Sequence, residues 1–141
     1  MIVVLLGKTS SGKDTVCNQL IQKGYKKLVT YTTRPMRPGE VQDETYHFIS
    51  KEEFETLISK GFFAEYTSYD AKEGTWLYGS AYDDYENADL IVILNPSGYE
   101  QILKNLNKED ITSFYIYSNI KTIKNRLKKR GDKKEEAARR I

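Results

Sequence analysis

A glycine-rich segment near the amino terminus has the spacing of a phosphate-binding loop. It reads Gly7-Lys8-Thr9-Ser10-Ser11-Gly12-Lys13, which matches the pattern G-x-x-x-x-G-K. Glycine permits backbone angles at which successive N–H groups converge on an anion, and the lysine adds a point charge. An apolar run precedes the segment and a helical pattern follows it, as a loop of this kind requires. We therefore predict that the segment holds the phosphates of a nucleotide.

One position departs from this pattern. Asp14 stands where serine or threonine normally binds Mg²⁺, and Thr15 is the next residue. A carboxylate is a suitable ligand for Mg²⁺, although it adds a negative charge beside polyphosphate. The sequence therefore offers Asp14 and Thr15 as candidate metal ligands.

A second segment also has the chemistry of anion binding. Arg34 and Arg37 lie three residues apart on a loop that Pro35 and Pro38 stiffen. Guanidinium forks match phosphate oxygens in shape and charge. We predict a second anion pocket here, and we expect it to face the glycine-rich loop across one cleft.

Hydrophobic periodicity predicts the elements that position both segments. The expected strands are Ile2–Leu6, Tyr25–Tyr31, Tyr46–Ile49, Phe62–Tyr69, Trp76–Ser80, Leu90–Leu94 and Phe114–Tyr117. The expected helices cover 13–23, the residues between Ser50 and Gly61, 97–106, 120–130 and 135–141. Buried strands that alternate with helices indicate a three-layer α/β/α fold with a parallel sheet. The short strands and the hairpin between 32 and 80 form an insertion on that core, with a polar turn through Asp70–Gly74.

Composition narrows the class of protein. The chain has 141 residues, which fits one domain, and 39% of them are hydrophobic, with no apolar run long enough for a membrane span. Cys17 is the only cysteine, so no internal disulfide forms, and we expect a cytoplasmic protein without a membrane partner. Residues 121–141 carry ten lysines and arginines against three acids. Such a basic segment attracts phosphates, but without interleaved aromatics it does not favour nucleic-acid binding.

With these motifs in view, the sequence resembles the guanylate kinase family of P-loop nucleoside monophosphate kinases. The resemblance rests on Thr32-Thr33-Arg34-Pro35-x-Arg37-x-Gly39-Glu40-Val41, Tyr46-His47-Phe48-Ile49-Ser50, Gly61-x-Phe63-x-Glu65 and Tyr78-Gly79-Ser80. These motifs follow in the family's order and nearly at its spacing. The resemblance implies a P-loop kinase fold with a small mixed-β insertion that binds the nucleoside monophosphate.

The resemblance also implies an activity: transfer of the ATP γ-phosphoryl group to GMP or dGMP, with Mg²⁺ accompanying ATP. The ATP site would comprise Gly7, Ser10, Ser11, Gly12, Lys13, Asp14 and Thr15. The acceptor site would comprise Thr30, Arg34, Arg37, Tyr46, Glu65, Tyr78, Gly79, Ser80 and Asn95. The catalytic cations would be Lys13, Arg34, Arg126, Arg130 and Arg140. Glu65 would accept the N1–H and 2-amino donors of guanine, a pair that adenine lacks.

The resemblance further divides the single domain into a core of 1–31 and 81–125, an insertion of 32–80 and a lid of 126–141. Besides Asp14, two features depart from the family pattern. Ile93 and Asn95 stand where aspartates are usual, and the resemblance implies that the family's C-terminal strand and helix are lacking. Two alternatives stay open, namely a related kinase for another nucleotide or a sugar phosphate, and a catalytically silent module that binds a protein. The sequence does not address the oligomeric state.

Overall fold

A four-stranded parallel sheet forms the core of the computed structural model, which describes residues 1–7, 12–86 and 89–116. The strand order is β2 (Lys26–Lys27), β7 (Leu90–Ile93), β1 (Ile2–Leu6) and β8 (Ile111–Tyr115), with all neighbours parallel. The central strands β1 and β7 are short apolar runs rich in isoleucine and valine, as expected of parallel strands covered on both faces.

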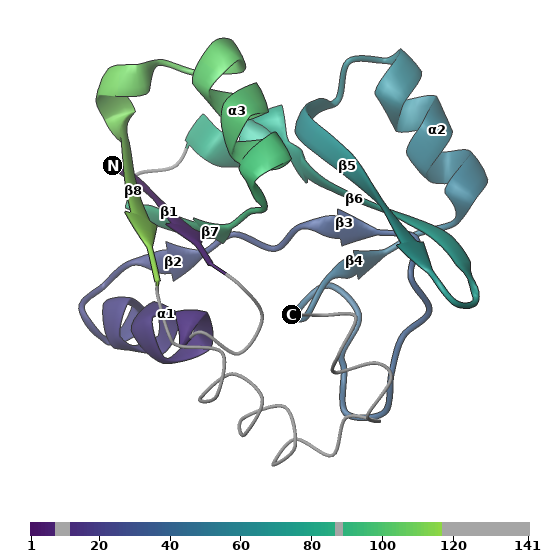
Figure 1. The fold of residues 1–141 in the computed structure, drawn as a ribbon, viewed down its shortest axis with the longest axis horizontal. Helices are drawn as coiled ribbons and strands as arrows, with labels where there is room; N and C mark the ends of the chain where they lie inside the picture. Colours follow the sequence, from purple (N-terminus) through teal and green to yellow (C-terminus); the bar gives the residue numbers. More distant parts are fainter. Residues whose placement is uncertain (8–11, 87–88, 117–141) are drawn as a thin grey trace.

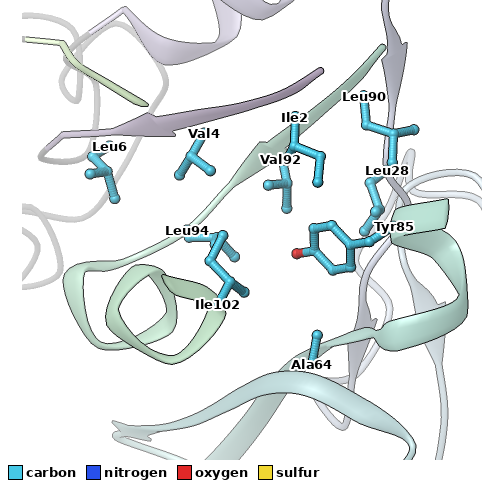
Figure 2. Packing of buried hydrophobic residues seen from close by; sticks show 10 residues of the cluster. All are labelled: Ile2, Val4, Leu6, Leu28, Ala64, Tyr85, Leu90, Val92, Leu94 and Ile102. Atoms are coloured by element: carbon cyan, nitrogen blue, oxygen red, sulfur yellow. The ribbon is translucent and has the colours of Figure 1, made fainter. Parts of the chain in front are cut away.

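Alternate residues of β1 supply two separate hydrophobic clusters, one on each face of the sheet. Val3 and Leu5 pack with Cys17 of helix α1 (Lys13–Gln22). On the other face, Ile2, Val4 and Leu6 pack with a larger cluster that includes Ile102 of helix α3 (Pro96–Asn105) (Figure 2). The sheet therefore lies between α1 and α3 (Figure 1), which confirms the predicted three-layer α/β/α fold.

A second, mixed sheet stands beside the core. Its order is β4 (His47–Phe48), β3 (Tyr31–Thr32), β6 (Gly74–Ala81) and β5 (Phe63–Ala71). Helix α2 (Lys51–Ser59) packs on it through the buried Phe54, and Ser50 caps that helix by accepting a hydrogen bond from the Glu53 N–H. Strand β5 packs against α3, which joins the mixed sheet to the core.

Short helices complete the connections within the described part of the chain. The 3-10 helix η1 (Tyr82–Glu86) follows β6 and returns the chain to the core, where Tyr85 is buried. A second 3-10 helix, η2 (Lys108–Asp110), precedes β8. No helix in the described residues is long and apolar enough to cross a membrane.

Four predicted strands differ from the observed ones. The expected strand Tyr25–Tyr31 is wrong as one element, because β2 pairs with β7 in the core and β3 pairs with β6 in the mixed sheet. The expected buried strand Phe114–Tyr117 begins earlier, as β8 at Ile111, and it lies last in the sheet order, which leaves Phe114 half exposed. The hairpin strands are longer than expected, and only residues 72–73 separate them.

The expected helices at 120–130 and 135–141 lie outside the described residues.

Candidate active site

A pocket of about 480 Å³ opens where the core meets the mixed sheet. Its walls come from the ends of β1 and β7, from one face of the β5–β6 hairpin, and from the loops that carry the two arginines. The lining residues are Gly7, Lys13, Thr30, Arg34, Arg37, Tyr46, Glu65, Thr67, Tyr69, Trp76, Tyr78, Gly79, Ile93, Leu94, Asn95 and Pro96. Gly7 and Lys13 of the glycine-rich segment thus line the same cavity as Arg34 and Arg37.

The end of β1 positions the lysine of the glycine-rich segment. Gly7 has φ 150° and Gly12 has φ 105°, both on the side of backbone space that favours glycine. Gly12 caps α1, so Lys13 begins that helix, and its Nζ donates a hydrogen bond of 2.7 Å to the carbonyl of Gly7. The ammonium group therefore lies beside the end of β1, where both Gly7 and Lys13 line the pocket.

The other predicted residues of this segment are placed differently. Asp14 and Thr15 are exposed on the first turn of α1 and do not line the pocket. Ser10 and Ser11 lie outside the described residues. Across the described ranges, no three histidine, cysteine, aspartate or glutamate side chains form a metal-binding group. Asp14 and Thr15 still provide a carboxylate and a hydroxyl beside Lys13, which are oxygen ligands of the kind Mg²⁺ takes together with nucleotide phosphates.

Arg34 is held in the pocket wall by a two-pronged ion pair. Its two terminal nitrogens donate to the carboxylate oxygens of Glu40 at 2.9 and 2.8 Å, and one of them also donates to the Pro35 carbonyl. The guanidinium carbon lies 5.3 Å from the ring centroid of Tyr46, within range of a cation–π contact. The hydrogen bonds from Arg34 lower the pKa of Glu40, and the same contact raises the pKa of Arg34. Both groups are therefore charged at neutral pH.

The remaining anion-binding candidates lie close to Arg34. Tyr46 and Tyr78 meet edge to face with ring centroids 6.0 Å apart, and both line the pocket. The backbone N–H of Arg37 donates to the Glu40 carboxylate at 2.7 Å, which leaves the Arg37 guanidinium at the cavity wall. A cation and two phenols thus share one side of the pocket, an arrangement that suits the oxygens of a phosphate.

Glu65 is a buried carboxylate at the base of the pocket. Only 5% of the residue is exposed, and the Ser80 hydroxyl donates to its Oε1 at 2.9 Å. Burial raises the pKa of Glu65 to about 7, and hydrogen bonds from Ser80 limit that rise. Such a group accepts hydrogen bonds from a ligand when ionised, and it gains from them because they replace lost hydration.

The neighbours of Glu65 include two other predicted site residues. Gly79 lies beside it, where a Cβ atom would come within 2.8 Å of the Phe63 ring, so the close packing of β6 on β5 requires glycine. Ser80 is fully buried behind the pocket and reaches it only through Glu65. Thr30 lines the cavity next to the arginine loop.

Asn95 links the core to the mixed sheet. It caps α3, because its Oδ1 accepts a hydrogen bond of 2.7 Å from the Gly98 N–H. Its Nδ2 donates to the Thr67 hydroxyl of β5 at 3.3 Å. The Asn95 amide therefore lies close to Glu65, and both its oxygen and its nitrogen form hydrogen bonds.

The pocket also contains residues that the sequence analysis missed. They are Thr67, Tyr69, Trp76, Ile93, Leu94 and Pro96. Three of them follow from strand alternation, because Thr67 and Tyr69 lie two and four residues after Glu65, and Trp76 lies two residues before Tyr78. The predicted lid arginines Arg126, Arg130 and Arg140 lie outside the described residues.

The fold and the pocket define a class of protein. The core is a parallel sheet with a glycine-rich segment between its first strand and first helix. A second sheet brings arginine and a buried glutamate to the same cavity. This is the architecture of a P-loop phosphotransferase of nucleotides. Comparison with known proteins is more specific, since residues 1–140 match the family described as guanylate kinase. The chain belongs to the guanylate kinase family, which confirms the resemblance seen in the sequence motifs.

Individual relatives agree with this assignment. A guanylate kinase of Clostridium tetani is 33% identical over 97% of this chain and 66% of its own length. One from Clostridioides difficile is 34% identical over 96% of this chain and 67% of its own length. The crystal structure of guanylate kinase from Anaplasma phagocytophilum is similar with a TM-score of 0.72 and 27% identity, over all of this chain and 70% of that one. The chain spans about two thirds of the length of these curated relatives.

Proposed function

We propose that this protein transfers the γ-phosphoryl group of ATP to GMP or dGMP and forms ADP with GDP or dGDP. The observation that carries the proposal is the single pocket that Lys13 lines together with Arg34, Arg37 and Glu65. A donor phosphate at Lys13 and an acceptor phosphate at the arginines would then share one cavity, as direct transfer between two nucleotides requires.

The acceptor nucleotide would be held at both its ends. Arg34, Arg37, Tyr46 and Tyr78 would bind its phosphate, since they gather at one wall of the pocket. Glu65 would accept two hydrogen bonds from guanine, and the match of two donors to one carboxylate would reject adenine. Thr30, Gly79, Ser80 and Asn95 would complete the surroundings of the base.

The chain's own residues would catalyse by alignment and charge. The attacking atom is an oxygen of an already anionic phosphate, so the reaction needs no general base. Lys13 would stabilise the negative charge that develops on the transferred group, and Arg34 would hold the attacking oxygen in line. We also assign Arg126, Arg130 and Arg140 of the basic segment to a lid that adds positive charge over the transferred phosphoryl group.

Mg²⁺ would accompany ATP, with Asp14 and Thr15 as its protein ligands. When bound, the ion would neutralise part of the negative charge on the ATP phosphates. We further propose that residues 1–31 and 81–125 act as the core, 32–80 as the acceptor-binding insertion and 126–141 as the lid. A cytoplasmic location agrees with the buried free thiol of Cys17.

A panel of acceptors tests the proposal. ADP release from ATP and Mg²⁺ would be measured with GMP, dGMP, AMP, CMP and UMP on the full chain. We expect stimulation by GMP and dGMP and little by the others. No stimulation by any monophosphate would disprove the kinase activity, and preference for another base or for a sugar phosphate would disprove the assigned acceptor.

A further inference from the structure

Tyr85 is a buried phenol inside an otherwise apolar cluster. The residue is 6% exposed, and its ring lies among Leu28, Leu90 and Val92 (Figure 2). Its hydroxyl oxygen points toward the side of the cluster where Leu94 and Ile102 lie, away from its own helix (Figure 2). A phenylalanine would fill nearly the same space without this polar group. Because burial of an unpartnered hydroxyl is unfavourable, its hydrogen-bond partner decides what the group does.

The partner of Tyr85 is Ser80, which connects it to the pocket. The two hydroxyl oxygens lie 2.8 Å apart, and Ser80 is also hydrogen-bonded to Glu65 at 2.9 Å. All three residues are buried, and they come from η1, β6 and β5. We call these three residues the Tyr85–Ser80–Glu65 chain. It runs from the hydrophobic cluster to the carboxylate at the base of the pocket.

The charge of Glu65 sets the direction of the hydrogen bonds in this chain. An ionised carboxylate only accepts, so the single proton of the Ser80 hydroxyl must be donated to Glu65. The oxygen of Ser80 is then left to accept, and Tyr85 is the donor. Burial raises the pKa of Tyr85 well above its ordinary value, so the phenol keeps the proton that it donates. The hydrogen bonds of the Tyr85–Ser80–Glu65 chain therefore stabilise the ionised form of Glu65.

The second carboxylate oxygen is restrained by packing. A Cβ atom built at Gly98 would lie 2.7 Å from Oε2 of Glu65, so the first turn of α3 closes against this oxygen. The carboxylate is thus bounded by Gly98 on one side and bonded by Ser80 on the other. How far the Glu65 carboxylate can rotate therefore depends on the strength of the hydrogen bond from Ser80.

We propose that Tyr85 is a positioning residue for recognition of the acceptor base, and that it acts on Glu65 through Ser80. This inference rests on the proposed function, because it assumes that Glu65 accepts the donors of guanine. A serine hydroxyl that accepts a hydrogen bond is a stronger donor in turn, since linked hydrogen bonds polarise one another. Tyr85 thereby keeps the carboxylate ionised and oriented before the nucleotide arrives.

Tyr85→Phe tests the inference in the full chain. We expect the KM for GMP to rise about fivefold, as for loss of one hydrogen bond, with kcat and the KM for ATP unchanged. We also expect the pH midpoint of the GMP KM to move upward, because a carboxylate with weaker hydrogen bonds has a higher pKa. Burial and Ser80 are what act on the pKa of Glu65. A purely structural role would not move this midpoint.

A matched control and a double variant distinguish an effect through the Tyr85–Ser80–Glu65 chain from a general effect on packing. Tyr82→Phe removes a hydroxyl from the same 3-10 helix, which packs against the same cluster, and it should leave the GMP KM unchanged. In a Ser80→Ala background, Tyr85→Phe should have no further effect on the GMP KM, because its route to Glu65 is gone. Thermal melting of each variant would verify that all are folded at the assay temperature.

The results that overturn the inference are distinct from those that overturn the function. An unchanged GMP KM in Tyr85→Phe, or an equal factor in the Ser80→Ala background, would disprove the positioning role of Tyr85 while GMP phosphorylation stands. Absence of GMP-dependent ADP release in the unaltered protein would disprove the proposed function and this inference with it.

Discussion

The two ends of the pocket hold their charged groups in different ways. At the acceptor end, Arg34 and Glu65 are buried, and each is hydrogen-bonded to other side chains, Glu40 and Ser80. At the loop end, Lys13 is only half buried and its ammonium group bonds to a backbone carbonyl. The acceptor end is therefore built into the protein interior, and the loop end lies at its surface.

This difference indicates a division of labour. Groups that are fixed by buried partners are preorganised, so little ordering is lost when a ligand binds. The same burial makes them part of the folded structure, because removal of one partner leaves a buried charge uncompensated. We therefore expect changes at the acceptor end to alter stability and activity together, and changes at the loop end to alter activity alone.

Lys13→Ala should have the largest effect on catalysis. Loss of a cation that stabilises the transferred phosphoryl group should lower kcat by roughly 10²- to 10³-fold. The melting temperature should hardly change, since Lys13 is at the surface end of the pocket. Kinetics with ATP and GMP, together with a thermal melt, would measure both. A large fall in melting temperature would contradict the division between the two ends.

Glu65→Gln should have the next largest effect, and it should be specific for guanine. Loss of a charged hydrogen-bond acceptor should lower kcat/KM for GMP by roughly 10- to 100-fold. In the unaltered protein, the GMP KM should fall as pH rises through about 7, where Glu65 ionises. The variant should lack that pH dependence. Equal losses for all monophosphates would show that Glu65 does not read the base.

The effect of Glu65→Gln on the free energy of unfolding depends on pH, and its sign can be predicted. Burial raises the pKa of Glu65 above its ordinary 4.5, so between pH 4.5 and about 7 the folded state binds more protons than the unfolded state. The free energy of unfolding therefore falls as pH rises across this range. Glu65→Gln should remove that decline and be the more stable protein at pH 8. Denaturant titrations at pH 5 and pH 8 would measure it.

Local patterns in the sequence were sufficient to predict much of the core and one end of the pocket. The glycines around Lys13 and the apolar run of Ile2–Leu6 predict a strand, a loop and a helix, because each signal depends only on near neighbours. The prediction of one strand over Tyr25–Tyr31 was wrong because the same local signals stop short of tertiary pairing. Hydrophobicity and β-propensity do not report where a chain leaves one sheet and enters another.

The contacts at the acceptor end could not be predicted from local patterns. One motif contains both Arg34 and Glu40, but their order in the sequence does not show that the two side chains form an ion pair. Ser80 meets Glu65 only because β5 and β6 pair with a register shift between Phe63 and Glu65. Tyr85 joins them through the return of η1 to the core. Side chains that meet through tertiary packing have no periodic signal, whereas Thr67 and Trp76 were within reach of strand alternation.

Glu40→Gln should have a smaller effect on activity than Glu65→Gln, together with a measurable loss of stability. The amide keeps the shape of the side chain but removes the charge opposite the buried Arg34, which should cost about 2 kcal/mol of unfolding free energy. The pKa of Glu40 is lowered from 4.5 in the folded protein. Its stabilisation is thus fully present above pH 4.5 and is lost as pH falls through the lowered value.

The difference between the Glu40→Gln variant and the unaltered protein should accordingly shrink in acid. Unfolding titrations at pH 7 and at pH 3.5 would measure it, with Glu44→Gln as a control on the same loop. A constant difference at both pH values would show that the charge of Glu40 does not stabilise the fold.

Thr67→Val should have the smallest effect, at a contact between the mixed sheet and the core. Valine matches threonine in shape but cannot accept the 3.3 Å hydrogen bond from Asn95 Nδ2. This long bond joins β5 to the start of α3, whereas the cap that Asn95 makes to Gly98 is untouched. Its loss should raise the GMP KM about twofold to threefold, with less than about 1 kcal/mol of destabilisation. A change as large as that of Glu65→Gln would mean that Asn95, and not the Tyr85–Ser80–Glu65 chain, dominates the geometry of the acceptor end.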